Sequence, residues 1–118
     1  MVDKLINLFK VLSDETRLRI LVLLYHRNLC VCQLQGIMNE SQPKISKHLA
    51  KLRDMGFVKD ERQEQFVFYY LDKTNNTLDI LLKTILSDIK EYPVLEKDIS
   101  QLGDADKYVE MKKGQSCY

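Results

Sequence analysis

The chain has 118 residues, is 45% hydrophobic and carries a formal net charge of +1, which favours one domain with its own core and excludes a polycation that coats nucleic acid. It has no apolar run near the roughly 20 residues that a membrane span needs, and its N-terminus, MVDKLINLFK, lacks the basic-then-apolar order of a secretion signal. Three cysteines, an odd number, favour the cytoplasm and reduced thiols or metal ligation over a disulfide scaffold.

Two helices are predicted at the beginning of the chain. Apolar residues at helical spacing predict an amphipathic helix over residues 3–12 and a second helix over residues 14–25. Ser13 is expected to cap the second helix, and Asp14 and Glu15 in its first turn oppose the positive end of the helix dipole. The second helix is apolar on most sides, so we expect it at the centre of the domain.

The next helix is predicted over residues 30–38 and begins with Cys30 and Cys32. Side chains two residues apart on a regular helix point about 200° away from each other, whereas an extended backbone turns them to the same side. A metal bound by both sulfurs is therefore expected to loosen the start of this helix. Two thiolates without histidine suit soft ions better than zinc or magnesium. The alternative is that both cysteines are small core residues.

Residues 41–58, SQPKISKHLAKLRDMGFV, predict a helix that is marked at both ends. Ser41 is a suitable N-cap, Pro43 falls in the first turn, and Gly56 suits the left-handed residue that closes a helix. One face is apolar, and the opposite face carries the lysines Lys44, Lys47 and Lys51. A basic helix joined to a preceding short helix is a helix-turn-helix that can enter a major groove. The alternative is an ordinary solvated surface.

A hairpin follows this helix. Residues 58–62 and 66–71 predict two strands, the second rich in aromatic and β-branched residues. An isolated hairpin is marginal in water, so one face should pack on the helices. Arg62 near the tip is expected to reach a DNA phosphate; the alternative is an exposed arginine without a contact. The predicted fold is mainly α with a β-hairpin wing (α+β), a winged helix-turn-helix.

A last long helix is predicted over residues 78–92, ended by Pro93. Its apolar stripe is too wide for a small domain to cover, so we expect part of it, together with the first helix, to pack against a second copy. Burial within one chain is the alternative. The DNA-binding and dimerisation domain is thus placed at residues 1–93. Residues 94–118 are expected to be a C-terminal tail, with a short helix near 94–102 and mobile residues after it.

Three segments in this order resemble the ArsR family of winged-helix metal-responsive repressors. The matching segments are the N-terminal signature (residues 8–21, LFKVLSDETRLRIL), the metal-box helix of arsenic-responsive members (29–34, LCVCQL) and the recognition helix (41–49, SQPKISKHL). The resemblance implies a homodimer, not an enzyme, that binds double-stranded operator DNA without a cofactor and represses a metal(loid)-resistance operon. Trivalent arsenic, As(III), or antimony, Sb(III), would bind Cys30 and Cys32 and release the DNA.

The resemblance also implies roles for individual residues. It directs four side chains toward DNA, namely Gln42, Pro43, Ser46 and Lys47. Arsenic-type members often carry a third cysteine where this chain has Gln35, and Cys117 of the tail is the candidate that would complete a three-sulfur site. The family's zinc site on the last helix is not expected, because both histidines, His26 and His48, lie elsewhere. Two alternatives remain on the same scaffold: a thiol-redox-responsive repressor, and a sensor of another soft metal such as cadmium or lead.

Overall fold

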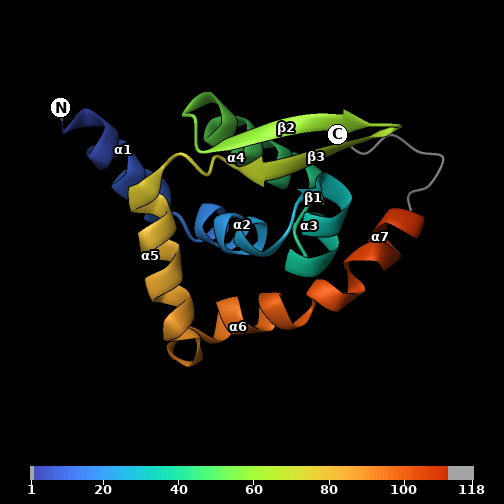
Figure 1. Ribbon diagram of the computed structural model, residues 1–118. Helices are drawn as coiled ribbons and strands as arrows, with labels where there is room; N and C mark the ends of the chain where they lie inside the picture. The colour runs from blue at the N-terminus through green and yellow to red at the C-terminus, as the bar shows by residue number, and fades with distance from the viewer. Residues whose placement is uncertain (1, 112–118) are drawn as a thin grey trace.

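The computed structural model describes residues 2–111 and places one helix, α2, at the centre of the molecule (Figure 1). The wing lies above α2, the C-terminal segment runs below it, and α1 and α5 lie at the side opposite α3 and α7. The elements in order are α1 (Asp3–Leu12), α2 (Glu15–His26), β1 (Leu29–Cys30), α3 (Val31–Met38), α4 (Gln42–Asp54), β2 (Val58–Gln63), β3 (Phe66–Leu71), α5 (Asn76–Ser87), η1 (Ile89–Glu91), α6 (Pro93–Ser100), η2 (Leu102–Asp104) and α7 (Ala105–Met111). Within residues 2–111, no helix has both the length and the apolar character that crossing a bilayer demands.

The central helix α2 begins one residue later than expected. Asp14, not Ser13, is its N-cap, and the carboxylate accepts a hydrogen bond of 3.0 Å from the backbone N–H of Arg17. This bond holds the pKa of the Asp14 carboxyl below its usual value, because it stabilises the charged form. Ser13 instead ends α1, where its hydroxyl donates to the Lys10 carbonyl at 2.7 Å. The predicted burial of α2 is confirmed by its run of wholly buried residues, Ile20, Leu21, Val22 and Leu23.

Helices α3 and α4 form the predicted helix-turn-helix. The turn between them uses Asn39 in the left-handed conformation, with φ 54°. Ser41 caps α4 and accepts from the backbone N–H of Lys44 at 3.4 Å. At the other end, Gly56 has φ 82° and the Phe57 N–H donates to the Leu52 carbonyl at 2.9 Å. This arrangement is a Schellman motif at the C-terminus of the helix. Both predicted ends of α4 are therefore confirmed.

The wing is a three-stranded antiparallel sheet in the order β1-β3-β2, not an isolated hairpin. Strands β2 and β3 pair from Val58 opposite Leu71 to Gln63 opposite Phe66. The tight turn has no glycine, and Glu64 adopts φ 58° there, which costs an L-residue about 1 kcal/mol. The short strand β1 pairs with β3 and sets Cys30 opposite Phe68, so the start of α3 is joined to the wing.

The C-terminal segment contains the short helix expected near residues 94–102, as α6, and a further helix, α7, that was not expected. Helix α5 ends at Ser87, and Pro93 begins α6 instead of only ending a helix. Helices α6 and α7 run beneath α2 and up along α3 (Figure 1). Leu95 and Ala105 are buried in this packing, and residues 105–111 form a helix in the part of the chain for which the sequence predicted no element. Cys117 lies outside the described residues.

Candidate thiol site and nucleic-acid interface

The two cysteine sulfurs lie side by side. Cys30 is the last residue of β1 and the N-cap of α3, with an extended backbone (φ −92°, ψ 171°), while Cys32 lies in the first turn of α3. Their Sγ atoms are 2.8 Å apart, and the residues are 0% and 3% exposed. The expectation that the sulfurs point apart until a metal loosens the helix is therefore wrong. Pairing with Phe68 holds Cys30 in the extended conformation that already turns both sulfurs to one side.

This donor pair fits a soft ion with little rearrangement. With two metal–sulfur bonds of about 2.3 Å, a separation of 2.8 Å corresponds to an angle of about 75° at the ion. Opening that angle to roughly 90–110° moves the sulfurs about half an ångström or more apart. Two thiol sulfurs without an oxygen or imidazole donor suit thiophilic ions. Within residues 2–111 there is no cluster of three His, Cys, Asp or Glu side chains able to hold a metal.

Gln33 supports the thiol pair and was not identified from the sequence. It is 1% exposed, and its Oε1 accepts the backbone N–H of Cys30 at 3.0 Å. Its Nε2 donates to the carbonyl of Ala105 in α7 at 3.2 Å. Cys30 and Gln33 occupy the N-cap and N3 positions of a capping box. That spacing, a polar residue three places after the cap, is a signal that the sequence already contained.

The outer face of α4 carries the predicted DNA-binding side chains. Pro43, Lys44, Lys47 and Lys51 are exposed, and Gln42 and Ser46 are half-buried beside them. The amide Nε2 of Gln42 donates to the Ser46 hydroxyl at 2.9 Å, and the Lys44 ammonium pairs with Glu40 at 2.9 Å. The structure thus brings all six residues onto one helix, with Lys47 and Lys51 extending into solvent.

Two arginines shape the wing. Arg53 at the end of α4 pairs with Asp60 of β2 at 3.1 Å, which joins the helix to the wing and raises the pKa of Arg53. Arg62 is exposed near the tip, and its Nε donates to the Glu64 carbonyl at 3.4 Å. Arg62 and the face of α4 therefore belong to neighbouring elements.

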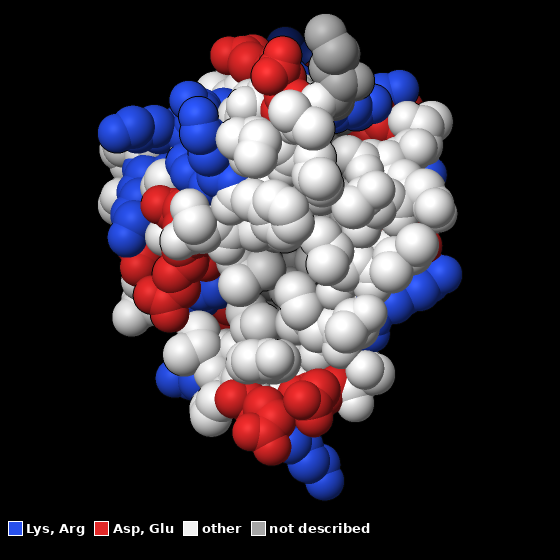
Figure 2. All heavy atoms as spheres, turned by 90° about the vertical axis from the view of Figure 1, so that its left-hand side faces the viewer, with Lys and Arg blue, Asp and Glu red and all other residues white. Residues whose placement is uncertain are grey.

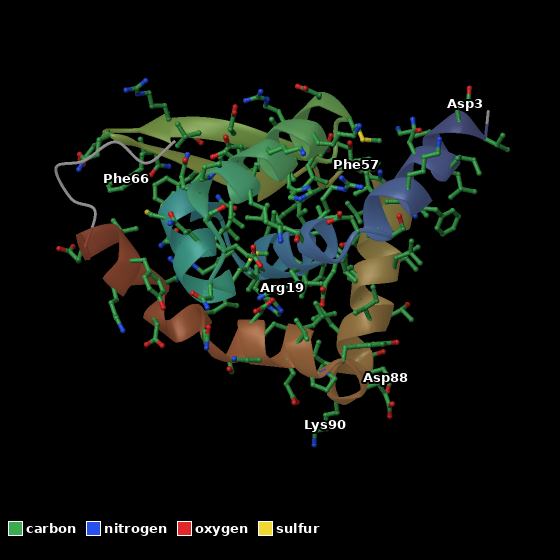
Figure 3. All side chains as sticks on the ribbon, turned by 180° about the vertical axis from the view of Figure 1, so that it is seen from behind. Asp3, Arg19, Phe57, Phe66, Asp88 and Lys90 are labelled. Carbon is green, nitrogen blue, oxygen red and sulfur yellow. The ribbon has the colours of Figure 1, made fainter. Side chains whose placement is uncertain are left out.

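Arg19 connects the C-terminal segment to the end of α3. Its guanidinium makes two hydrogen bonds to the Asp98 carboxylate, at 2.8 and 2.9 Å, and donates to the Met38 carbonyl at 3.2 Å. In Figure 3 its side chain points from α2 toward α6. The bonds to Asp98 raise the pKa of Arg19, because they stabilise the charged form. The group fixes the last residue of α3 directly before the turn into α4.

The histidines lie apart from the thiols in sequence. His48 is half-buried on α4 and His26 ends α2. Burial lowers the pKa of both imidazoles, because it penalises the protonated form. Neither residue lies on α5, where the alternative zinc site of the resembling family would require one.

Comparison with known proteins gives consistent matches. The sequence model described as "Bacterial regulatory protein, arsR family" matches residues 14–60. "Arsenic resistance transcriptional regulator ArsR2" of Pseudomonas putida is 52% identical over 67 residues, which are 56% of this chain and 58% of that protein. The match thus spans little more than half of that relative's length. "Arsenic resistance transcriptional regulator ArsR1" of the same organism is 41% identical over 86 residues, 71% of this chain and 67% of that protein.

A solved structure extends these matches. The AntR antimony-specific transcriptional repressor superposes with a TM-score of 0.63 and 28% identity, covering 74% of this chain and 78% of that one. Both relatives and this neighbour are transcriptional regulators, which agrees with the prediction that the chain is not an enzyme. On the matched segments, the winged helix-turn-helix and the 41% identity to ArsR1, the chain belongs to the ArsR family of bacterial regulatory proteins.

Proposed function

We propose that this chain is a dimeric, cytoplasmic repressor that binds operator DNA through α4 and the wing and leaves it when As(III) or Sb(III) binds Cys30 and Cys32. The observation that carries the proposal is the pair of sulfurs 2.8 Å apart at the start of the helix that precedes α4. The names of the relatives, which refer to arsenic and antimony, support the choice of inducer.

Two direct connections lead from the sulfurs to the proposed DNA-binding surface. Cys30 is paired with Phe68 in the wing sheet, and only three residues separate the end of α3 from the start of α4. An ion that spreads the sulfurs by about half an ångström presses on the end of β1 and the start of α3, because both side chains are enclosed in the core and have little free space. Because packed elements resist small continuous deformation, such a displacement is taken up by re-orienting the wing or α4.

An apolar face supports the proposed dimer. Figure 2 shows a broad uncharged surface on the side of the molecule formed by α1 and α5. Its exposed large apolar side chains include Leu5, Ile6, Phe9 and Ile80, which are 41–53% exposed. A patch of this kind marks an interface. Phe9→Glu should convert a dimer to a monomer in light scattering after gel filtration, whereas Lys10→Glu, on the neighbouring position, should not.

A titration tests the inducer. Under reducing conditions, one equivalent of arsenite per monomer should produce sulfur-to-metal charge-transfer absorption. It should also weaken binding to a duplex selected from a random-sequence library. The Cys30→Ser/Cys32→Ser variant should bind the same duplex as tightly as the parent and ignore arsenite. Loss of DNA binding by that variant would instead identify the cysteines as structural. Cys117→Ser tests the third ligand: a site that needs Cys117 loses arsenite affinity in this variant.

A redox response is the second candidate function, favoured by the closeness of the two sulfurs. Loss of two electrons and two protons to an oxidant such as a peroxide would join them in a disulfide. If oxidants release the duplex and neither arsenite nor cadmium does so under reducing conditions, the redox function replaces the metal-sensing one.

A further inference from the structure

Helix α7 lies along the face of α3 that holds the thiol pair. Gln33 of α3 donates from its Nε2 to the Ala105 carbonyl, and both residues are buried. Three residues further along α3, Gly36 meets the ring of Tyr108 so closely that a Cβ at Gly36 would overlap the ring. The close packing of α7 on α3 therefore depends on Gly36 in α3 and on the ring of Tyr108 in α7.

The thiols are on the covered side of α3. Cys32 precedes Gly36 by four residues, and side chains four apart on a helix lie on the same face. Gln33, which contacts α7, also holds the backbone N–H of Cys30. The exposed fractions of Cys30 and Cys32 are 0% and 3%, so an ion or a reagent cannot reach the sulfurs while every surrounding element stays in place.

We propose that α7 is a cover that must lift before a reagent or an ion reaches Cys30 and Cys32, and that Gln33, Gly36 and Tyr108 set how firmly it is seated. The part of this inference that concerns ions rests on the proposed function, and the part that concerns reagents does not. Among the elements around the thiols, α7 is joined to the rest by few buried apolar side chains, because of its residues 105–110 only Ala105 is fully buried, while Tyr108 and Val109 are half-buried. Such an element opens more easily than a core strand or helix.

The cover also reaches the wing. Val109 and Glu110 of α7 line a groove of about 320 Å³ together with Phe66 and Phe68 of β3. Phe68 is the residue paired with Cys30 in the sheet. Lifting α7 therefore removes its contacts with the thiol helix and opens the groove between α7 and the wing.

Ion binding and the lifting of α7 affect each other to the same extent, because the coupling free energy between two equilibria is reciprocal. If an ion binds better when the cover is lifted, then any change that lifts the cover strengthens ion binding by the same factor. Gly36→Ala introduces the overlapping Cβ, while alanine favours the helix more than glycine does, so α3 itself is not weakened. Tyr108→Ala loosens the cover in another way, by removing the ring.

The first measurement is the rate at which N-ethylmaleimide labels the thiols of the full chain under reducing-agent-free, anaerobic conditions, followed by tryptic mass spectrometry. Cys30 and Cys32 fall in the peptide of residues 28–44 and Cys117 in that of residues 114–118, so each site is read separately. We expect both variants to label the first peptide about tenfold faster than the parent. Gln35→Ala, at the neighbouring position, is the matched control and should label at the parent's rate.

The double variant tests the mechanism. Because the overlap requires the ring, adding Gly36→Ala to Tyr108→Ala should change the rate by less than about twofold. Circular dichroism melts establish that each variant is folded. Parent-like labelling in both single variants would overturn the proposal, and so would full additivity in the double variant.

The second measurement is the arsenite affinity of the same proteins, from the charge-transfer absorption. Both single variants should bind about tenfold more tightly than the parent, matching the gain in labelling rate. Faster labelling with parent-like or weaker arsenite affinity would overturn the linkage between ion binding and the lifted position of α7. Faster labelling in a protein whose parent form binds no arsenite would support the cover and contradict the proposed inducer, so the two failures are distinguishable.

Discussion

Removing Asp98 should destabilise the whole domain, because it leaves the Arg19 guanidinium without its carboxylate. The Asp98 side chain is 3% exposed and that of Arg19 15% exposed. Breaking a buried ion pair by deleting one partner costs about 3–5 kcal/mol. Arg19 keeps its bond to the Met38 carbonyl and has some access to water, so we expect Asp98→Ala to cost about 3 kcal/mol, the lower end of that range.

This free energy converts to a measurable shift in melting temperature. With an unfolding entropy of about 2.1 cal/mol/K per residue, 118 residues give about 0.25 kcal/mol/K, so a loss of about 3 kcal/mol lowers Tm by about 12 °C. The assay is a circular dichroism melt at one fixed protein concentration, because the proposed dimerisation would make Tm depend on concentration. Arg19→Met combined with Asp98→Leu should recover most of the loss, since apolar pairs often replace buried ion pairs without cost. A drop below about 4 °C for Asp98→Ala would refute the reasoning.

Three other predictions concern the DNA, the wing and pH. Lys47→Ala should weaken binding to every duplex alike and reduce the slope of log K against log salt by about 0.9, as expected for one lost phosphate contact; a changed sequence preference with an unchanged slope would contradict this. Glu64→Gly should stabilise the domain by about 0.5 kcal/mol in urea unfolding, because relief of roughly 1–2 kcal/mol of strain at the positive φ outweighs the roughly 0.4–1 kcal/mol by which glycine favours the unfolded chain; a lower urea midpoint would show that the strain is smaller than this entropy. Burial lowers the pKa of both His26 and His48, so below about pH 6.5 the unfolded chain binds more protons than the folded one. Stability should therefore fall as pH drops from 6.5 through the lowered pKa values and then level off, and replacing both histidines by glutamine should flatten that profile; an unchanged slope would assign it to carboxylates instead.

The sequence predicts the helix-turn-helix well because its signals are local. Ser41, Pro43 and Gly56 lie at the ends of α4 and act within a few residues of themselves. The resemblance of residues 8–21, 29–34 and 41–49 leads to the family that the comparisons establish.

The geometry of the thiol site could not be predicted in the same way. A shift of one residue at the start of α3 changes the two sulfurs from opposed to adjacent, and helix boundaries are uncertain by more than that. The shift comes from pairing between Cys30 and Phe68, which are distant in sequence, in a strand of only two residues. A strand this short has no local sequence pattern that predicts it.

The short helix expected near residues 94–102 is present as α6, but neither its packing beneath α2 nor the following helix α7 was predicted, because the burial of this segment is not apolar in pattern. Asp98 is 2% exposed because it meets Arg19, a partner 79 residues away. Ala105 is buried, and its own carbonyl accepts a hydrogen bond from the Gln33 side chain. In the sequence alone, a segment with few hydrophobic residues and an acidic residue is interpreted as exposed, because the residues that pack against it are not known.

The strand order of the wing has one further consequence, which concerns solubility. Because β3 lies in the middle, β2 presents an open row of backbone groups along its outer side. Such an edge invites strand addition by other chains. After Val58 every residue of β2 is exposed, and four consecutive ones, Lys59, Asp60, Glu61 and Arg62, are charged. A second strand added to this edge would have to desolvate that run of charges, so the charges of β2 protect the wing from edge-to-edge aggregation. The same strand is expected to approach the DNA backbone.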